Sequence, residues 1–201
     1  LAIDREALVT HVARGGQIPS ASLVPDGLAG YRALSLPLFD PEQARQLLRE
    51  AGYAKPADLP PIALMYNTSE GHKQVAEAIQ QMWKKELGIR VELENQEWKV
   101  FLANAEQLNF QVCRMGWTGD YADPFTFLEL LTTACGNNHS NWSSPDYDAL
   151  LRVANRESDP ATRLKLLREA EALAIAAQPL IPLYVYTRSQ LIKPYVRGIE
   201  G

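Results

Sequence analysis

The chain has 201 residues, 46% hydrophobic and 22% charged, so it is long enough to enclose a substantial core and too apolar for an intrinsically disordered protein. Its net charge of -4 and its interspersed lysines and arginines argue against a nucleic-acid-binding surface, and no apolar run approaches the roughly 18–20 residues that cross a bilayer. The sequence opens on "LAIDREALV", without methionine or signal peptide, so we expect it to be the interior of a longer protein.

The first quarter of the chain is predicted to contain two helices separated by a long ordered loop. Asp4 precedes an apolar-periodic run that the glycines at 15–16 end, which predicts a short helix. Residues 19–38 are rich in proline, glycine and serine and show no period, so we expect a loop there. Asp40, followed directly by proline, is a typical N-cap for a helix that ends at Gly52.

The next segment alternates strand and helix patterns. The apolar run "PPIALMYN" predicts a buried strand, "IRVELEN" a half-buried strand and "NFQVCRMGW" a third strand. A long amphipathic helix from Ser69 to Gly88 and a second helix at "EWKVFLANAE" connect them. This β-α-β-α-β order over residues 61–117 predicts a largely parallel sheet with helices against its faces.

The remaining residues are predicted to be mainly helical. Helices are expected at about 123–133, at 144–155 and at 159–177, the last with an N-cap aspartate followed by proline. "LIPLYVYT" predicts a final apolar strand.

The cysteines and tryptophans are interpreted structurally. Cys113 and Cys135 are too far apart for a C-x-x-C motif, and they form either one disulfide in an exported protein or two buried thiols. Trp83 and Trp98 lie in helical stretches and are expected in the core, while Trp142 is expected to anchor a loop.

Two strand ends fall at the same edge of the predicted sheet. Ligands of open α/β sheets bind beyond the carboxyl ends of the strands. "YNTSEGH" leaves the first strand of this sheet and "RMGWTGDYAD" leaves the third. The sequence therefore predicts that these two segments converge on one functional region.

Catalysis and metal binding have little support in this region. The chain contains no G-x-S-x-G, G-x-G-x-x-G, G-x-x-x-x-G-K-[ST] or H-E-x-x-H motif, and its three histidines show no ligand spacing. Asp120 and Asp123 are close in sequence, but the sequence establishes no substrate cleft for an acid–base pair. We expect no catalytic residue, no metal and no cofactor.

Three residues near the strand ends each admit two interpretations. Asp120 should be partly desolvated between two aromatic residues, so either Arg114 or a helix N-terminus compensates its charge, or it awaits a cationic ligand. His72, in the first turn of its helix, is either a surface histidine or part of an anion subsite. Arg114 either neutralises an acid within the fold or binds an anion.

Taken together, the segments resemble a known family. They are, in chain order, "AIDREALV", "FDPEQARQLLREAGY", "YNTSEGHKQVAEAIQQMWKKELGIRVELENQEWKVFL", "RMGWTGDYADPFTFLELL" and "NWSSPDYDALL". Over nearly the whole chain this set resembles the C-terminal half of the extracytoplasmic solute-binding proteins of oligopeptide and dipeptide ABC importers. "LENQEWKVFL" is more similar to the oligopeptide branch.

The resemblance implies a fold, a function and a location. The fold is an α/β, periplasmic-binding-protein-like (type II) lobe with a mostly parallel central sheet flanked by helices. Residues 1–190 would be the peptide-binding C-terminal lobe, and residues 191–201 a segment that returns toward an N-terminal lobe outside this chain. The complete receptor would close over small peptides and deliver them to the permease and ATPase of its transporter. It would be periplasmic or extracytoplasmic, and lipid-anchored in a Gram-positive cell.

The resemblance also assigns roles to single residues. Asp120 matches the aspartate that pairs with the peptide ammonium, and Arg114 and His72 match basic residues that receive the peptide carboxylate in some members. Gly116, Trp117 and Thr118 match the strand whose main chain hydrogen-bonds the extended peptide. The alternatives are a related receptor for a nickel chelate, haem or a murein peptide, or an acid–base hydrolase using Asp120 and His72.

Three departures from the family pattern leave the preferred peptide length and the disulfide open. Ala13 and Ala105 stand where some oligopeptide binders have a lysine and an arginine. Thr118 stands where the family has a cysteine, so any disulfide must join Cys113 and Cys135 or be absent.

Overall fold

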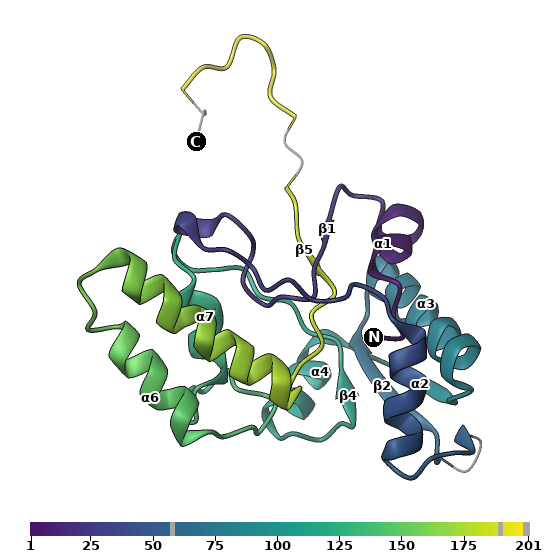
Figure 1. Cartoon of the computed structure of the whole chain (residues 1–201). Helices are drawn as coiled ribbons and strands as arrows, with labels where there is room; N and C mark the ends of the chain where they lie inside the picture. The colour runs from purple at the N-terminus through teal and green to yellow at the C-terminus, as the bar shows by residue number, and fades with distance from the viewer. Residues whose placement is uncertain (57–58, 189–190, 199–201) are drawn as a thin grey trace.

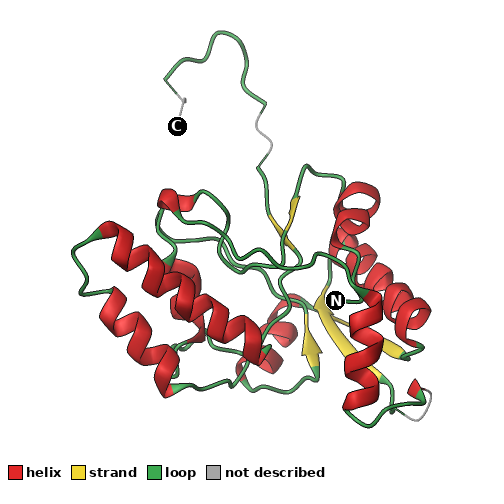
Figure 2. Cartoon of the chain, viewed as in Figure 1, coloured by secondary structure: helices red, strands yellow, loops and turns green. Residues whose placement is uncertain are grey.

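A computed structural model describes residues 1–56, 59–188 and 191–198. Figure 1 shows a parallel sheet with helices α1, α2 and α3 beside it, a helical region built on α6 and α7, and a short ribbon of β1 and β5 between the two. Figure 2 shows the same arrangement by secondary structure, with most of the chain in helices and loops.

The central sheet has three parallel strands in the order β3-β2-β4, as the sequence predicts. β2 (Ile62–Asn67) pairs with β3 (Val91–Gln96) along its whole length, and with β4 (Val112–Cys113) through two residue pairs. The connecting helices are α3 (Glu70–Leu87) and α4 (Trp98–Glu106). The predicted β-α-β-α-β order is therefore confirmed, although β4 is shorter than expected.

The other helices begin largely where the sequence predicts. They are α1 (Arg5–Ala7) continuing into the π-helix η1 (Leu8–Ala13), the 3₁₀ turn η2 (Leu28–Gly30), α2 (Pro41–Glu50), α5 (Phe125–Leu128), the 3₁₀ turn η4 (Glu129–Leu131), α6 (Pro145–Ala154) and α7 (Pro160–Ala177). The side chains of Asp40, Ser144 and Asp159 accept hydrogen bonds from the first-turn amides of α2, α6 and α7. These caps satisfy amides that have no partner within the helix.

The last predicted strand does not join the central sheet. β5 (Tyr184–Val185) pairs antiparallel with β1 (Ile18–Pro19), which lies at the edge of the segment predicted as a loop. Proline at the second position of β1 lacks an N–H group, which limits this ribbon to a short ladder. Next to the ribbon, the buried Arg5 donates from Nε to the carbonyl of Pro182 at 2.8 Å and ties β5 to the start of the chain.

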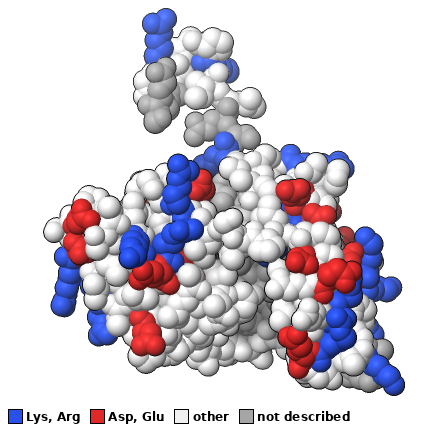
Figure 3. Space-filling view, viewed as in Figure 1, with Lys and Arg blue, Asp and Glu red and all other residues white. Residues whose placement is uncertain are grey.

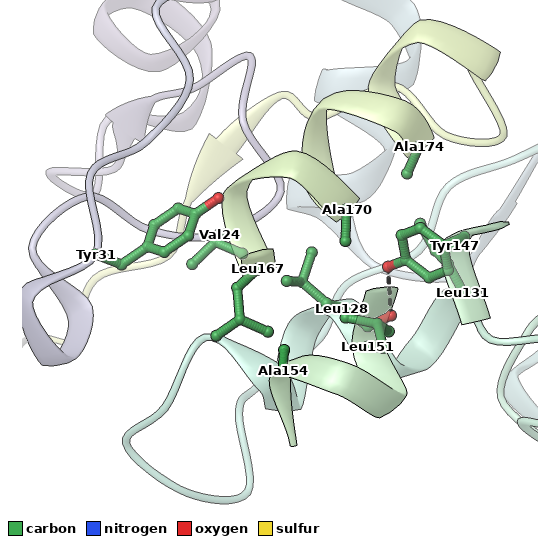
Figure 4. Packing of buried hydrophobic residues seen from close by; sticks show 10 residues of the cluster. All are labelled: Val24, Tyr31, Leu128, Leu131, Tyr147, Leu151, Ala154, Leu167, Ala170 and Ala174. Carbon is green, nitrogen blue, oxygen red and sulfur yellow. Dashed lines mark hydrogen bonds between the residues drawn. The ribbon is translucent and has the colours of Figure 1, made fainter. Parts of the chain in front are cut away.

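Two main clusters of buried apolar residues form the core. One surrounds α6 and α7 (Figure 4) and comprises Val24, Tyr31, Leu128, Leu131, Tyr147, Leu151, Ala154, Leu167, Ala170 and Ala174. The other lies between the sheet, α1 and α3 and comprises Ile3, Leu8, Leu64, Tyr66, Val75, Ala76, Ile79, Ile89 and Val91. Trp83 packs against the second cluster and Trp142 against the first, as predicted.

A fully buried carboxylate joins α7 to the long loop that follows β1. Oε1 of Glu171 accepts hydrogen bonds from the Ser22 hydroxyl at 2.7 Å and from the backbone amides of Leu23 and Val24 at 2.6 and 2.8 Å. Its Oε2 accepts from the hydroxyl of Tyr31 at 2.5 Å. Burial, followed by the charge of Glu171, raises the pKa of Tyr31 above its ordinary value. Glu171 therefore satisfies four donors of a segment that has little regular structure.

Cys113 and Cys135 are separate, half-buried thiols and form no disulfide, and burial raises the pKa of Cys113 to about 12. Acidic and basic side chains are intermixed on the face drawn in Figure 3. No helix within the described ranges has both the length and the apolar character that crossing a bilayer requires.

The predicted boundary after residue 190 lies outside the described residues, as do residues 199–201. Residues 191–198 project away from the body of the chain (Figure 1). Their apolar members Leu191, Ile192, Tyr195 and Val196 are all exposed.

Candidate functional site

A cavity of about 400 Å³ opens where β2 and β4 end. Its lining residues are Asn67, His72, Trp98, Phe101, Arg114, Met115, Gly116, Trp117, Thr118 and Tyr186. They come from the end of β2, the first turn of α3, α4, the segment after β4 and the residue after β5. The predicted convergence of the two strand ends is therefore confirmed. Five of the six predicted site residues lie together here, and Asp120 is not among the lining residues.

His72 lies in the first turn of α3 with its ring against the end of β2. Its Nδ1 is 2.8 Å from Oδ1 of Asn67. Burial and then the positive charge of Arg114 lower the pKa of His72, although the contact with Asn67 opposes them. The imidazole is therefore neutral at pH 7 while the cavity holds no anion.

Arg114 presents a partly buried cation to the cavity. Its backbone amide donates to the carbonyl of Met65 at 2.8 Å, which continues the ladder one residue beyond β4. Its guanidinium donates to the hydroxyl of Tyr186 and lies 5.8 Å from the centre of that ring. Burial lowers the pKa of Arg114 from its ordinary value. Within the described part of the chain no carboxylate forms an ion pair with Arg114, so it does not neutralise Asp120.

The segment after Arg114 leaves its main chain unpaired. The backbone amides of Gly116, Trp117 and Thr118 donate to no group within the described ranges. A Cβ atom on Gly116 would lie 3.1 Å from the ring of Tyr186, so only glycine fits beside that ring without displacement. The buried indole N–H of Trp117 also has no hydrogen-bond partner among the described residues. The edge of the cavity is therefore rich in free donors.

Asp120 is exposed, and the expectation that it is partly desolvated is wrong. Its carboxylate forms no hydrogen bond or ion pair with the described residues, whereas its backbone amide donates to Oγ1 of Thr126 at 3.1 Å. The physical reason is that the chain has left the sheet by this point and runs along the surface toward α5. The carboxylate therefore has no partner in the part of the chain that the structure describes, and it does not line the cavity.

The kinds of partner considered for the charge of Asp120, an arginine and a helix N-terminus, pair instead with Asp123. Both oxygens of Asp123 accept hydrogen bonds from Arg163 at 2.8 Å, and Oδ1 also accepts from the amide of Phe125 at 2.8 Å. Burial opposes ionisation of Asp123, but the hydrogen bonds from Arg163 and Phe125 hold its pKa below the usual range. An arginine and a helix N-terminus thus compensate the charge of Asp123, while neither of them pairs with Asp120.

The sequence model described as "Bacterial extracellular solute-binding proteins, family 5 Middle" matches residues 1–139. The chain belongs to this family. It is 37% identical over 205 residues to the oligopeptide-binding protein OppA of Bacillus subtilis, covering 98% of this chain and 38% of that protein. The predicted resemblance to solute-binding proteins is therefore confirmed.

Solved structures of the family share the fold. The murein tripeptide binding protein MppA of Escherichia coli matches with a TM-score of 0.90 and 38% identity, covering 98% of this chain and 40% of that one. Haemophilus influenzae OppA in complex with the peptide RPPGFSPFR matches with a TM-score of 0.88 and 32% identity, with coverages of 98% and 40%. The fold is thus that of a periplasmic-binding-protein-like lobe, and the chain spans about two fifths of these solute-binding proteins.

The sequence analysis did not predict the aromatic wall of the cavity, which Trp98 and Phe101 form. Trp98 was expected in the core, but its side chain is 51% exposed and stacks on Phe101 with ring centres 5.7 Å apart. The i, i+3 spacing of these two residues places them on one face of α4, which is the signal that could have identified the wall. The position of Tyr186 in the cavity was not predicted either. This residue follows β5, and no local sequence pattern indicates that β5 ends close to the central sheet.

Proposed function

We propose that this chain is the ligand-binding lobe of the peptide receptor of an ABC importer, and that it holds peptides by their termini and main chain. The observation that carries the proposal is the order of unpaired groups along the segment from residue 114 to residue 120. Among the described residues, Arg114 is a cation without a carboxylate partner, Gly116 to Thr118 have unpaired backbone amides, and Asp120 is a carboxylate without a cationic partner.

An extended peptide fits this order of charges. With its main chain beside residues 116–118, its ammonium group would face Asp120 and its carboxylate would face Arg114 and His72. Main-chain hydrogen bonds give affinity that is independent of the peptide's side chains. The cavity, with Trp98 and Phe101 on one wall, leaves room for side chains of different kinds.

The proposal includes the rest of the receptor. Residues 1–190 would form the lobe, and residues 191–201 would lead back toward the N-terminal lobe, whose closure would exclude water from the bound peptide. The partners would be the permease and ATPase of the transporter. The receptor would act in the periplasm or outside the cell, lipid-anchored in a Gram-positive organism, and without catalysis.

A murein peptide is a second candidate ligand, because MppA matches this chain as well as the oligopeptide-binding relatives do. The hydrolase alternative has less support. It would need Asp120 and His72 in one cleft, and only His72 lines the cavity.

Replacing Asp120 with asparagine tests the proposal. In the complete receptor, the variant should bind a peptide with a free amino terminus at least about tenfold more weakly, because the ammonium loses its charged partner. Isothermal titration calorimetry with the same peptide in N-acetylated form should show no such loss. Asp146→Asn, an exposed change on α6, is the matched control. Equal losses for the free and acetylated peptides would contradict the proposed pairing.

Peptide binding should also depend on pH through His72. The lowered pKa keeps the free imidazole neutral at pH 7, whereas a carboxylate bound beside it favours the imidazolium. The affinity for a peptide with a free carboxylate should therefore rise as the pH falls from about 7 to about 5.5, a range in which the ammonium group of the peptide stays largely charged. A C-terminally amidated peptide and the variant His72→Gln should each give a flat profile over this range. A rise that persists in His72→Gln would assign the proton to another group.

A further inference from the structure

A bidentate ion pair joins α7 to the loop that carries Asp120. Nη1 of Arg163 lies 2.8 Å from Oδ2 of Asp123, and Nη2 lies 2.8 Å from Oδ1. The two side chains are 23% and 25% exposed, so water screens them only in part. A two-point contact of this kind fixes orientation as well as distance.

The same loop is held at a second point, directly beside Asp120. The amide of Asp120 donates to Oγ1 of Thr126, which is fully buried. A Cβ atom on Gly119 would lie 2.9 Å from Cγ2 of Thr126 and 3.3 Å from the ring of Phe127, so the loop packs tightly against α5. The main chain is therefore fixed on both sides of an exposed carboxylate that forms no hydrogen bond or ion pair with the described residues.

Since no hydrogen bond or ion pair within the described ranges holds the carboxylate, its position depends on the backbone that carries it. We propose that Arg163, acting through Asp123, is a positioning residue that fixes Asp120 for the ammonium group of the ligand. This inference rests on the proposed function of Asp120. A loop that loses the ion pair must be ordered again when the ligand binds, and that cost weakens the affinity.

The experiment compares Arg163→Met and Arg163→Lys with Lys165→Met in the complete receptor. Lys165 is exposed on the same helix, where it approaches Glu169 at 3.9 Å, so its replacement removes an equal charge without touching the loop. We expect Arg163→Met to bind a peptide with a free amine about three- to tenfold more weakly. The N-acetylated peptide should bind as it does to the wild type. Lysine, which cannot form the two-point contact, should restore part of the affinity.

A double variant that combines Arg163→Met with Asp120→Asn distinguishes a positioning role of Arg163 from a general effect on the stability of the protein. If Arg163 acts through Asp120, then Arg163→Met should cause no further loss of affinity in the Asp120→Asn background. Hydrogen exchange of the Asp120 amide in the 201-residue chain should also be faster in Arg163→Met than in Lys165→Met. This exchange measurement requires no ligand, so it stays informative if the variant binds no peptide.

The possible outcomes are distinguishable. If Asp120→Asn leaves the affinity for the free-amine peptide unchanged, the proposed function fails. Suppose instead that Asp120→Asn weakens the binding of the free-amine peptide. If Arg163→Met then lowers the affinity for the free-amine and the acetylated peptide equally, or changes neither affinity, the positioning role is wrong. An Asp120 amide whose exchange is unaffected by Arg163→Met would overturn it as well.

Discussion

Replacing Glu171 with alanine is expected to lower the free energy of unfolding by about 3–5 kcal/mol, the largest effect on stability that we predict. The carboxylate accepts from two hydroxyls and two backbone amides, all belonging to the segment from Ser22 to Tyr31. Removal leaves these donors buried without a partner, next to the core around α6 and α7. Urea denaturation followed by circular dichroism would measure the change.

The control for this change is Glu169→Ala, two residues earlier on α7. Glu169 is half exposed and lies 3.9 Å from Lys165, so its loss should change the stability by less than about 1 kcal/mol. Glu171→Gln should lie between the two, since an amide can replace only part of the acceptor capacity of a carboxylate. If Glu171→Ala were no more destabilising than the control, water would have to satisfy the four donors.

Replacing Arg114 with methionine is expected to weaken the binding of a peptide with a free carboxylate by about 2–5 kcal/mol, or roughly thirty-fold to several thousand-fold. The guanidinium is partly buried and faces no carboxylate of the described chain, so an anionic ligand would be its charged partner. Methionine keeps an apolar stem against Tyr186 while it removes the charge. Titration calorimetry with the complete receptor measures the loss.

Two comparisons test whether this loss comes from the carboxylate. The amidated peptide should lose much less affinity, because it offers Arg114 no charge. Arg152→Met, an exposed change on α6, should leave both affinities unchanged. Equal losses for the free acid and the amide would mean that Arg114 shapes the cavity without binding an anion.

The elements that could be predicted from the sequence are those with local signals. The caps at Asp40 and Asp159 and the amphipathic pattern after Ser69 identify their helices to within a few residues. The apolar run before Asn67 identifies β2. Because alternating strands and helices force a parallel sheet, the strand-end rule also placed His72, Arg114 and residues 116–118 in one cavity.

The features that were missed depend on contacts between distant parts of the chain. Nothing near Asp123 indicates that Arg163, forty residues later, pairs with it, so the compensated carboxylate could not be told from the free one. The exposure of Trp98 depends on how α4 packs against the sheet. The position of Tyr186 depends on a ribbon with only two paired positions on each strand, too short for a periodic signal.

The ribbon of β1 and β5 also bears on the order of folding. β1 is synthesised well before β5, because residues 20–183 separate the two strands, so the ribbon cannot form until this intervening segment has been made. A nascent chain that ends before β5 lacks both this ladder and Tyr186. Contacts between such distant segments are slow to form, so completion of the cavity should be among the last events of folding.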